Sequence, residues 1–484
     1  MTVPITSSSE QQARRRKTVI WVVGLAAMAQ IFDGYGMVVF GAVVSTFLRD
    51  PAQLGEMTPT MAGALGSYAM IGVLFGALLA GAFSDLVGRR RIMLLSFAWF
   101  SVGMALTALT SAPTTFGLMR FVTGLGVGAI TATAGALVAE FAPPGKKNLC
   151  IAITYSGVPV GSLLAALLSI ILHDTIGWRG MFLIGALPLV TLLPLALSKM
   201  PESPTWLLSR GRVDQARVIA ERTGAPLDEA PAAPPVRQAK SVTTRERSGF
   251  VGLFGSAGNL LSAVRLGFMS LAGLLVIYSL NTWLPEMMQR AGYSTEGSLS
   301  FLLVLNGGAV VGALIGSRVA DRFGPKLVVA TSFLLGAISI ALLTVDAPLG
   351  ILLIFVAIVG LGTSGTQTLL FGFVANYFRT NVRGAAVAWC AGFGRLGGIG
   401  GPLLGGVMIT AGFTLNSIFY LLAALALFGA VLTLFVPAGR SHQDQPAPLE
   451  TSSATSGTGL QAVLPAPKSP GQQTTNPWGE RNAG

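Results

Sequence analysis

The sequence is poor in charged residues, cysteine and histidine. Only 11% of its 484 residues are Asp, Glu, Lys or Arg, whereas soluble globular domains carry about 25%. The two cysteines and two histidines are widely separated, which excludes a disulfide framework and a zinc site of the usual spacing. We interpret Cys150 and Cys390 as packing residues, and we place His173 in a short outer loop and His442 in the C-terminal tail. No metal site is expected.

Hydrophobic residues and glycine are abundant instead. Hydrophobic residues make up 52% of the chain, which also contains 61 glycines, and glycine is more frequent in membrane helices than in soluble ones. A net charge of +12 would suggest nucleic acid as the partner of a soluble protein. Here the basic residues lie between apolar runs. We therefore expect the partner to be the anionic surface of a lipid bilayer and not nucleic acid. Basic residues 14–17 precede a run that is too long for a signal peptide.

Apolar runs with the ~20 residues that a membrane helix needs recur along the chain. They predict an all-α membrane protein with twelve transmembrane helices in two pseudo-symmetric six-helix bundles. The predicted spans are 18–47, 60–83, 91–111, 114–139, 148–172, 180–198, 263–288, 297–319, 327–345, 348–377, 384–411 and 414–437. The predicted regions are an N-terminal tail (1–17), two bundles (18–198 and 263–437), a linker between them (199–262) and a disordered tail (438–484).

Lysine and arginine are unevenly distributed between the two sides of this topology. The N-terminus and the even-numbered connections are basic, whereas the odd-numbered connections carry only Arg49, Arg179 and Arg290. Because basic loops remain in the cytoplasm, we expect both termini and the linker to be cytoplasmic.

Two pairs of loops occupy matching places in the two halves. One pair follows the second and eighth predicted spans, and the other follows the fourth and tenth. The loop after the second predicted span and the loop after the eighth both contain an acid, a glycine three residues later and a base. Glycine permits a tight turn out of a helix, and an acid at a helix end can meet an arginine or a neighbouring helix N-terminus. These loops indicate a repeat of two bundles with a cavity between them, and they predict a conformational latch between the halves. The alternative is that the arginines only set the topology. The predicted latch residues are Asp85, Gly88, Arg89, Glu140, Asp321, Arg322 and Arg383.

The loop with Gly81, Asp85 and Gly88 followed by arginines resembles the signature of the major facilitator superfamily. Residues 120–126, with Arg120 at their start, resemble the fourth-helix motif of that superfamily. The resemblance covers roughly residues 18–437 and implies transport by a bacterial cytoplasmic membrane protein.

More specific features resemble the aromatic acid:proton symporter family, which includes transporters of the benzoate and 4-hydroxybenzoate type. Asp33 and Gly34 lie where that family usually has Asp-Gly-x-Asp, and residues 383–406 closely resemble its eleventh helix. Residues 201–207 resemble a motif shared by several branches. Gly36 replaces the family's second aspartate, which removes one candidate proton or substrate group. Ser317 takes the place of the glycine that opens the second-half loop.

Three ionisable residues stand out inside the predicted spans, where a charge at the bilayer centre costs about 2.5–3.5 kcal/mol. Asp33 lies near the middle of the first span, and burial disfavours its charged form, so it is our candidate proton carrier. Arg395 has small neighbours and can bind a carboxylate bidentately, so it is our candidate substrate anchor. Alternatively, these two residues form a permanent ion pair or join helices. Arg120 either tunes the proton site or extends to the outer interface.

Other polar and aromatic residues in the predicted spans are candidates for lining the cavity, although each such residue more often serves an interhelical hydrogen bond or helix packing. Aromatic rings favour edge or stacked contacts with an aromatic ligand. The predicted substrate-binding residues, besides Arg395, are Tyr35, Tyr155, Asn306, Gln367 and Trp389.

These residues and the resemblance together imply proton-coupled uptake of a small aromatic carboxylate by a monomer. The proton gradient drives the cycle, and no cofactor is expected. Symport of another organic anion is an alternative. Proton-coupled export of drugs or metabolites is less favoured, because the glycine–proline pattern lies in the eleventh span rather than the fifth. A further alternative is a transporter-like sensor, which would bind its ligand without net transport. An enzyme is not expected, because the sequence shows no nucleophile–base group, metal spacing or phosphate loop.

Overall fold

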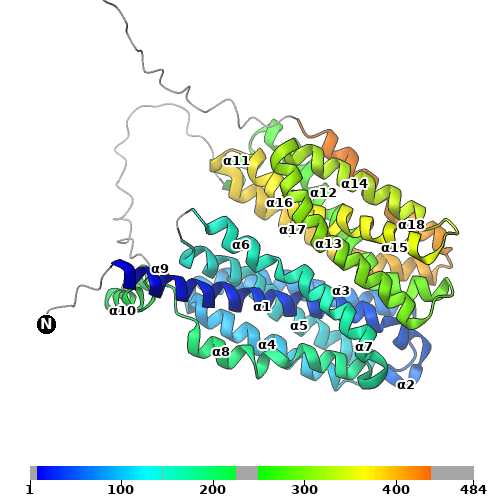
Figure 1. Ribbon diagram of the computed structural model, residues 1–484, viewed down its shortest axis with the longest axis horizontal. Coiled ribbons are helices and arrows are strands. Elements are labelled where there is room, and N and C mark those ends of the chain that lie inside the picture. Colours follow the sequence, from blue (N-terminus) through cyan, green and yellow to red (C-terminus); the bar gives the residue numbers. More distant parts are fainter. Residues whose placement is uncertain (1–7, 144, 225–248, 438–484) are drawn as a thin grey trace, which may run out of the picture. The chain divides into compact units, whose positions relative to one another are not determined.

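The computed structural model describes residues 8–143, 145–224 and 249–437. Every regular element within these residues is a helix, so the predicted all-α fold is confirmed (Figure 1). Met1–Ser441 form one compact unit. The predicted C-terminal tail with His442 lies outside the described residues.

The N-terminal half contains the first six predicted spans. Gly88 ends α3 with φ 110°, a conformation that favours glycine, and α4 begins at the next residue. The helices are α1 (Ser8–Arg49), α2 (Pro51–Leu54), α3 (Pro59–Val87), α4 (Arg89–Ala108), α5 (Pro113–Phe141), α6 (Lys147–Tyr155), α7 (Gly157–Gly185), the 3₁₀ helix η1 (Leu187–Leu189) and α8 (Leu192–Lys199).

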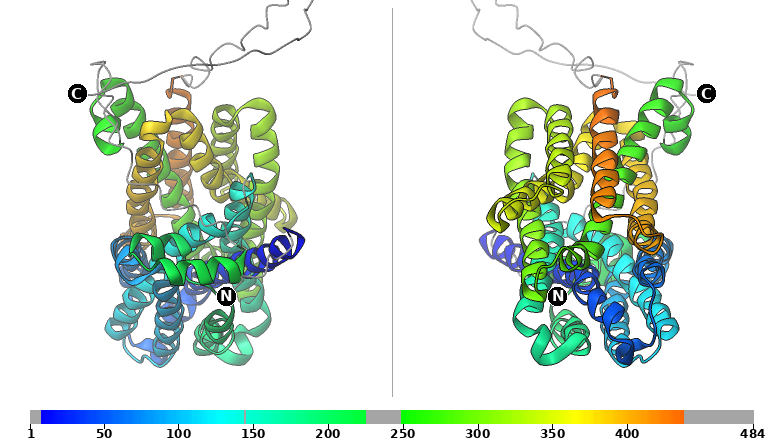
Figure 2. Two further views of the ribbon diagram at one scale, coloured as in Figure 1. Left: turned by 90° about the vertical axis from the view of Figure 1, so that its left-hand side faces the viewer. Right: turned by 90° about the vertical axis from the view of Figure 1, so that its right-hand side faces the viewer.

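Two further helices follow in the region predicted as the linker. They are α9 (Pro204–Ser209) and α10 (Val213–Thr223). Ser203 caps α9 by accepting a hydrogen bond from the Trp206 amide (3.0 Å). Gly224, which ends α10, approaches the backbone of Gln11 and Arg15 so closely that it leaves little room for a side chain. The end of α10 therefore packs against the beginning of α1 (Figures 1 and 2).

The C-terminal half contains the other six predicted spans. Gly324 separates α13 from α14 with φ 87°, the counterpart of Gly88 in the first half. The helices are α11 (Gly249–Phe254), α12 (Ala257–Arg290), α13 (Thr295–Phe323), α14 (Pro325–Leu342), α15 (Leu349–Gly360), the π-helix η2 (Leu361–Gly365), α16 (Thr366–Tyr377), α17 (Thr380–Thr410) and α18 (Leu415–Leu434).

Ten helices of the described chain are long and apolar enough to cross a membrane. The sixth and eleventh predicted spans are also helical, but they are not among these ten helices. The sixth is divided among the end of α7, η1 and α8, and its apolar helix Leu187–Lys199 is short. The eleventh is α17, a single helix of 31 residues whose glycines and Arg395 lower its hydropathy. Because α17 packs against α3 and α12, it belongs to the bundle.

The predicted outer connection around His173 is a break between two helices that follow each other within α7. His173 lies within α7, and its Nε2 is hydrogen-bonded to Thr46 Oγ1 of α1 (3.2 Å). The chain leaves the helical path only at Gly177, where φ is 63°. A single glycine thus forms the connection, because glycine can adopt a conformation in which one helix ends and the next begins.

Small residues bring the helices of each bundle close together. A Cβ at Gly124 would overlap the Ala69 carbonyl of α3, and one at Gly128 would overlap the Val73 carbonyl. The glycines of the fourth-helix motif therefore serve helix packing.

The two halves make their closest contacts at one end of the unit. We call it the outer end, after the predicted orientation; Arg49 and Arg290 lie there, whereas Gly88 and Gly324 lie at the cytoplasmic end. Gly41 of α1 lies against the Asn281 carbonyl of α12, leaving no room for a Cβ.

Polar contacts between the halves occur at the same outer end. Gln289 Nε2 donates to Ser45 Oγ (3.0 Å), and Arg49 lies 3.9 Å from the carboxylate of Glu286. Ser67 Oγ donates to the Ile399 carbonyl (2.6 Å). Between described residues, the hydrogen bonds and ion pair that join the halves all lie in the outer half of the helices. This arrangement corresponds to a unit that is closed at its outer end.

Candidate functional site

Asp33 lies in the middle of α1 and is buried. Thr131 of α5 donates a hydrogen bond from its Oγ1 to Asp33 Oδ2 (3.1 Å). The second carboxylate oxygen, Oδ1, is buried and has no hydrogen-bond donor among the described residues. An unsatisfied buried carboxylate oxygen is costly, and a proton on it would remove the charge. This geometry suits a group that gains and loses a proton.

Arg395 lies on α17, in the opposite half, and is half-buried. It forms no hydrogen bond or ion pair with another residue in the described part of the chain. Its guanidinium is nevertheless near enough to interact electrostatically with Asp33. The two predicted residues therefore converge across the interface of the halves, without the direct ion pair that was the alternative.

The glycines beside Arg395 hold α17 against α12. A Cβ at Gly394 would overlap Ser270 Oγ, and one at Gly397 would overlap the Leu271 carbonyl. The close approach of two helices fixes the backbone at Arg395. A fixed backbone gives the guanidinium a defined starting point for binding an anion.

Two tyrosines complete this group, which we call the central cluster: Asp33, Arg395, Tyr155 and Tyr278. Both tyrosine hydroxyls interact electrostatically with Arg395 and with Asp33. Tyr155, at the end of α6, donates to the Thr131 carbonyl (2.9 Å). Tyr278 of α12 contacts Met37 Sδ of α1 (3.2 Å) and therefore touches the opposite half.

Tyr278 is a residue that sequence reasoning missed. It lies in an apolar span without a neighbouring charge or motif. Gly398, three residues after Arg395, faces the Tyr278 ring, and a Cβ there would lie 3.0 Å from it. The available signal was a hydroxyl-bearing aromatic residue in the seventh span, but its position opposite Arg395 depends on the packing of α12 on α17.

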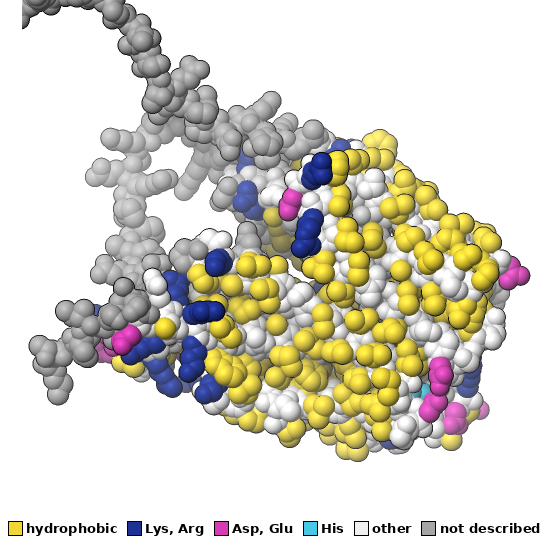
Figure 3. Space-filling model, viewed as in Figure 1, with side chains coloured by type: hydrophobic (Ala, Val, Ile, Leu, Met, Phe, Trp, Pro, Cys, Tyr) yellow, Lys and Arg dark blue, Asp and Glu magenta, His cyan; other side chains and the backbone are white. Residues whose placement is uncertain are grey.

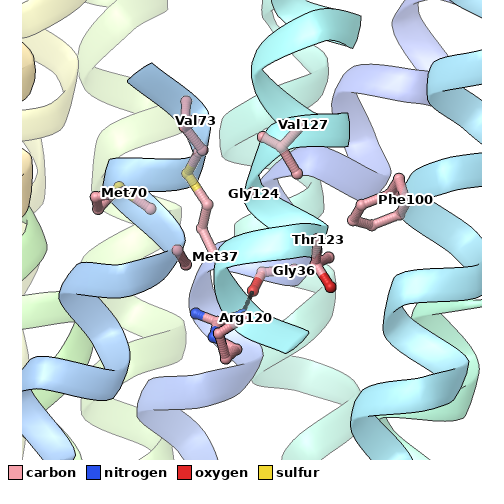
Figure 4. Close-up of a pocket in the computed structure, with 10 residues that line it drawn as sticks. Gly36, Met37, Met70, Val73, Phe100, Arg120, Thr123, Gly124 and Val127 are labelled. Atoms are coloured by element: carbon pink, nitrogen blue, oxygen red, sulfur yellow. Dashed lines mark hydrogen bonds between the residues drawn. The ribbon is translucent and has the colours of Figure 1, made fainter. Parts of the chain in front are cut away.

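Arg120 is buried inside the N-terminal half and does not extend to the outer interface. Its Nη1 donates to the Gly36 carbonyl of α1 (3.0 Å), as Figure 4 shows. The guanidinium also lies over the rings of Phe40 (5.0 Å to the centroid) and Phe182 (6.0 Å), which are favourable cation–π positions. Among the described residues no carboxylate forms an ion pair with it. Arg120 thus contacts α1 three residues beyond Asp33.

A small cavity of about 10 Å³ lies between Gly36, Arg120, Phe100 and Val127 (Figure 4). This volume is roughly that of one water molecule. A Cβ at Gly36 would lie 3.3 Å from the Phe100 ring, so a side chain there would require only a small shift of that ring. The absence of a side chain at position 36 leaves the Arg120 guanidinium beside a backbone carbonyl.

The other predicted lining residues are engaged within one bundle. Tyr35 donates its hydroxyl to the Met181 carbonyl (2.7 Å). Asn306 donates to Asn281 Oδ1 (3.0 Å), and Trp389 donates its indole N–H to the Ala263 carbonyl (2.9 Å). The structure therefore does not bring these three polar groups into the central cluster.

Gln367 differs from those three residues. Its Nε2 donates to Ser270 Oγ (2.9 Å), and its Oε1 is buried without a donor in the described part of the chain. Ser270 is also the residue that contacts Gly394, next to Arg395. Gln367 thus supports the α12–α17 contact from α16.

The latch residues of the first half contact one another within that half. Arg89 forms an ion pair with Glu140 of α5. Glu202, which precedes α9, accepts a hydrogen bond at Oε1 from the Arg90 amide (3.0 Å) and thereby caps α4. Sequence analysis gave Glu202 no role, although the motif around it was recognised. The side chain of Asp85 lies outside the described residues.

The latch residues of the second half are exposed at the cytoplasmic end. Asp321 and Arg383 form no ion pair with another described residue, and Arg322 lies over the Phe323 ring (5.5 Å). A latch between the halves would be released when the outer end is closed. Its formation in another conformation stays a prediction.

Comparison with known proteins extends over nearly all of the helical unit. The family model of sugar (and other) transporters matches residues 22–438. The benzoate transport protein of Acinetobacter baylyi is 31% identical over 430 residues, which are 88% of this chain and 91% of that protein. The gentisate transporter of Corynebacterium glutamicum is also 31% identical, over 89% of this chain and 92% of that protein.

Solved structures show the same fold. The partially occluded, inward-open xylose transporter XylE of E. coli superposes with a TM-score of 0.67 at 18% identity, covering 87% of this chain and 98% of that chain. The family and the relatives are membrane transporters and not enzymes. The chain is a multi-pass membrane protein that belongs to the sugar (and other) transporter family of the major facilitator superfamily.

Proposed function

We propose that this chain takes up a small aromatic carboxylate, of the benzoate or hydroxybenzoate type, together with protons. The observation that carries the proposal is the central cluster, in which Asp33 and Arg395 approach each other from opposite halves. Asp33 has a carboxylate oxygen without a donor, and Arg395 has a guanidinium without an acceptor among the described residues. The names of the relatives, a benzoate and a gentisate transporter, support an aromatic acid as the substrate.

Each member of the cluster has a distinct part in the proposed cycle. Arg395 binds the substrate carboxylate through two parallel hydrogen bonds. Tyr155 and Tyr278 offer aromatic faces and edges to the substrate ring. Asp33 takes up the proton. While Asp33 is charged it attracts Arg395, and when it is protonated it releases Arg395 to the substrate.

This coupling makes proton and anion load together. With both bound, the charge on Asp33 is neutralised by the proton and the charge on Arg395 is compensated by the carboxylate, which lowers the cost of closing the cluster away from water. The contacts between the two halves then break at one end and form at the other, as alternating access requires. We infer the orientation from the basic connections, so that the termini and α9–α10 face the cytoplasm of a bacterial inner membrane.

Uptake into liposomes tests this function. The purified chain is reconstituted, and accumulation of labelled benzoate is measured with an inward proton gradient, without a gradient, and with the gradient collapsed by a protonophore. We expect accumulation only with the gradient. Equal uptake in all three conditions would rule out proton symport.

A panel of unlabelled competitors tests the substrate class. Benzoate, 4-hydroxybenzoate and gentisate are compared with cyclohexanecarboxylate, which keeps the carboxylate but lacks the aromatic ring, and with phenol, which keeps the ring but lacks the carboxylate. We expect competition by the aromatic acids alone. Competition by cyclohexanecarboxylate with equal strength would indicate a general organic-anion symporter.

A further inference from the structure

A second cavity lies at the cytoplasmic end of the N-terminal half, away from the central cluster. It has a volume of about 630 Å³ and is formed by the beginnings of α1 and α4, the end of α8 and the end of α10. Cavities of several hundred Å³ are the size that binds small molecules. The aromatic acid cycle proposed above does not use this cavity.

The walls of this cavity are strongly basic. Its lining includes Arg14, Lys17, Arg90, Lys199 and Arg222, which come from four different helices. Figure 3 shows Lys and Arg side chains gathered at this end of the N-terminal half. Five cations around one cavity repel one another unless an anion lies between them.

Among the described residues, the one acid that lines the cavity is Glu202, and it is already engaged. Glu202 accepts hydrogen bonds from the backbone amides of Arg90 (3.0 Å) and Ser203 (3.1 Å). In the described part of the chain, Arg14, Lys17, Lys199 and Arg222 form no ion pair with a carboxylate. The cavity therefore has an excess of positive charge that the protein itself does not compensate.

One guanidinium of the cavity wall, that of Arg90, is held in place. Arg90 Nη2 donates to the Leu197 carbonyl (2.7 Å), which fixes the guanidinium, whereas Nε is buried and has no acceptor among the described residues. A fixed guanidinium with a free N–H is suited to a phosphate oxygen.

The position of the cavity relative to lipid-facing surface favours a membrane ligand. Trp21 lines it, with Lys199 Nζ 5.8 Å from the Trp21 ring, and tryptophan is enriched at the membrane interface. Leu197 also lines it and is 53% exposed, and Val190, between η1 and α8, is 69% exposed. A headgroup in the cavity would thus have its acyl chains beside an exposed apolar surface.

We propose that this cavity binds the phosphate group of an anionic phospholipid from the cytoplasmic leaflet. Lys17, Arg90, Lys199 and Arg222 surround the phosphate, and the acyl chains lie along Leu197 and Val190. The bound lipid bridges the beginning of α1, the end of α8 and α10. It thereby holds the cytoplasmic helix α10 against the first membrane helix.

The test compares two charge-matched variants of the full chain. Lys17→Gln/Arg222→Gln removes two cations that line the cavity. Arg16→Gln/Arg217→Gln removes two cations from the same helices that do not line it, and both of its residues are exposed. Binding of phosphatidylglycerol is measured by native mass spectrometry of protein taken from nanodiscs that contain phosphatidylcholine with increasing phosphatidylglycerol.

We expect the wild-type chain to retain phosphatidylglycerol in preference to phosphatidylcholine. The lining variant should bind phosphatidylglycerol about 10- to 30-fold more weakly, because each cation near an anionic membrane surface contributes about a factor of five. The matched variant should bind as the wild type does. Equal weakening in both variants, or in neither, would overturn the proposal.

A second arm distinguishes the lipid from a soluble phosphate. Inorganic phosphate and glycerol 3-phosphate are added to the detergent-solubilised chain, and its thermal unfolding is followed. We expect little stabilisation by either compound and clear stabilisation by phosphatidylglycerol in the wild type. Stabilisation by soluble phosphate that depends on Lys17 and Arg222, without any effect of the lipid, would overturn the lipid assignment.

Discussion

At the scale of single residues, the two central charges differ in how the protein satisfies them. Asp33 receives one hydrogen bond, from Thr131, and keeps one oxygen without a donor in the described part of the chain. Arg395 has no such bond, whereas Arg120 is held by the Gly36 carbonyl and two aromatic rings. A buried cation held by a carbonyl and two rings is suited to a structural or tuning role, and a cation without such partners is suited to binding a ligand.

Replacing Arg395 by lysine tests its role as the substrate anchor. Lysine keeps the charge but cannot form two parallel hydrogen bonds to a carboxylate. Losing charge-assisted hydrogen bonds costs about 1.5–3 kcal/mol, so KM for benzoate should rise roughly 10- to 100-fold. Arg318→Lys is the control, because Arg318 is exposed and bonds only to the Leu314 carbonyl of its own helix. An unchanged KM in Arg395→Lys would argue against direct binding.

Replacing Asp33 by asparagine tests its role as the proton carrier. Asparagine has the same shape and can still accept the Thr131 hydrogen bond, but it cannot exchange a proton. We expect gradient-driven accumulation of benzoate to be lost, while exchange of labelled for unlabelled benzoate across the liposome membrane continues. Asp346→Asn, at an exposed position after α14, should leave both activities intact. Accumulation that persists in Asp33→Asn would show that another group carries the proton.

At the scale of helices, glycine determines where α1 meets its neighbours. Gly34 lies against the Val158 carbonyl of α7, and Gly41 lies against the Asn281 carbonyl of α12. The first contact is inside one half, and the second joins the two halves. The same helix therefore packs permanently on one side and takes part in the closure of the outer end on the other.

Gly41→Ala should open the outer end. The added methyl group overlaps the Asn281 carbonyl, and overpacking of this kind costs about 1–3 kcal/mol in the closed form only. We expect a Ser45→Cys reporter to react faster with a membrane-impermeant maleimide from outside when Gly41→Ala is present. Gly24→Ala, in the same helix but with nothing within 4 Å, is the matched control. Equal labelling of the two variants would mean that the Gly41 contact does not govern closure.

Glu202→Gln should weaken the beginning of α4. The carboxylate accepts the Arg90 amide and lies at the positive end of the helix, an arrangement whose loss costs about 1 kcal/mol. We expect the unfolding temperature in detergent to fall by about 2–4 °C. Glu221→Gln, at an exposed position on α10, should have no effect. A similar fall in both variants would assign the effect to net charge instead of capping.

At the scale of the whole unit, the two halves are joined at the outer end. Gln289 Nε2 of α12 lies 3.0 Å from Ser45 Oγ of α1, and Arg49 and Glu286 pair beside them. Glu286 also accepts a hydrogen bond from Arg290 Nε (2.7 Å). These contacts must break if the cavity is to face outward, so alternating access requires the halves to separate here.

A disulfide across this contact should arrest the cycle. In Ser45→Cys/Gln289→Cys, oxidation should link α1 to α12, and benzoate uptake should stop until a reductant is added. Cys150 and Cys390 are buried, so they should not interfere. Each single cysteine variant, treated with the same oxidant, should retain uptake. Undiminished uptake by the cross-linked double variant would show that the halves need not separate at this position.

The repeated loops and the number of spans could be predicted from the sequence because they depend on local physics. About 20 apolar residues form a membrane helix whatever surrounds them, and Gly88 and Gly324 adopt the turn conformations that their position suggested. The connection near His173 is shorter than predicted and lies after that residue, because the single glycine at position 177 separates the two helices.

The sequence by itself determined that Asp33, Arg120 and Arg395 are unusual, because a charge inside an apolar span is costly in any fold. Only the tertiary structure decided which of them belong together. It placed Arg395 near Asp33, added Tyr278, and directed Arg120 to Gly36 and Tyr35 to Met181. The reason is that the partners of a residue on a buried helix depend on the rotation of that helix and on which helices pack beside it. Those features follow from contacts between residues that are far apart in the chain.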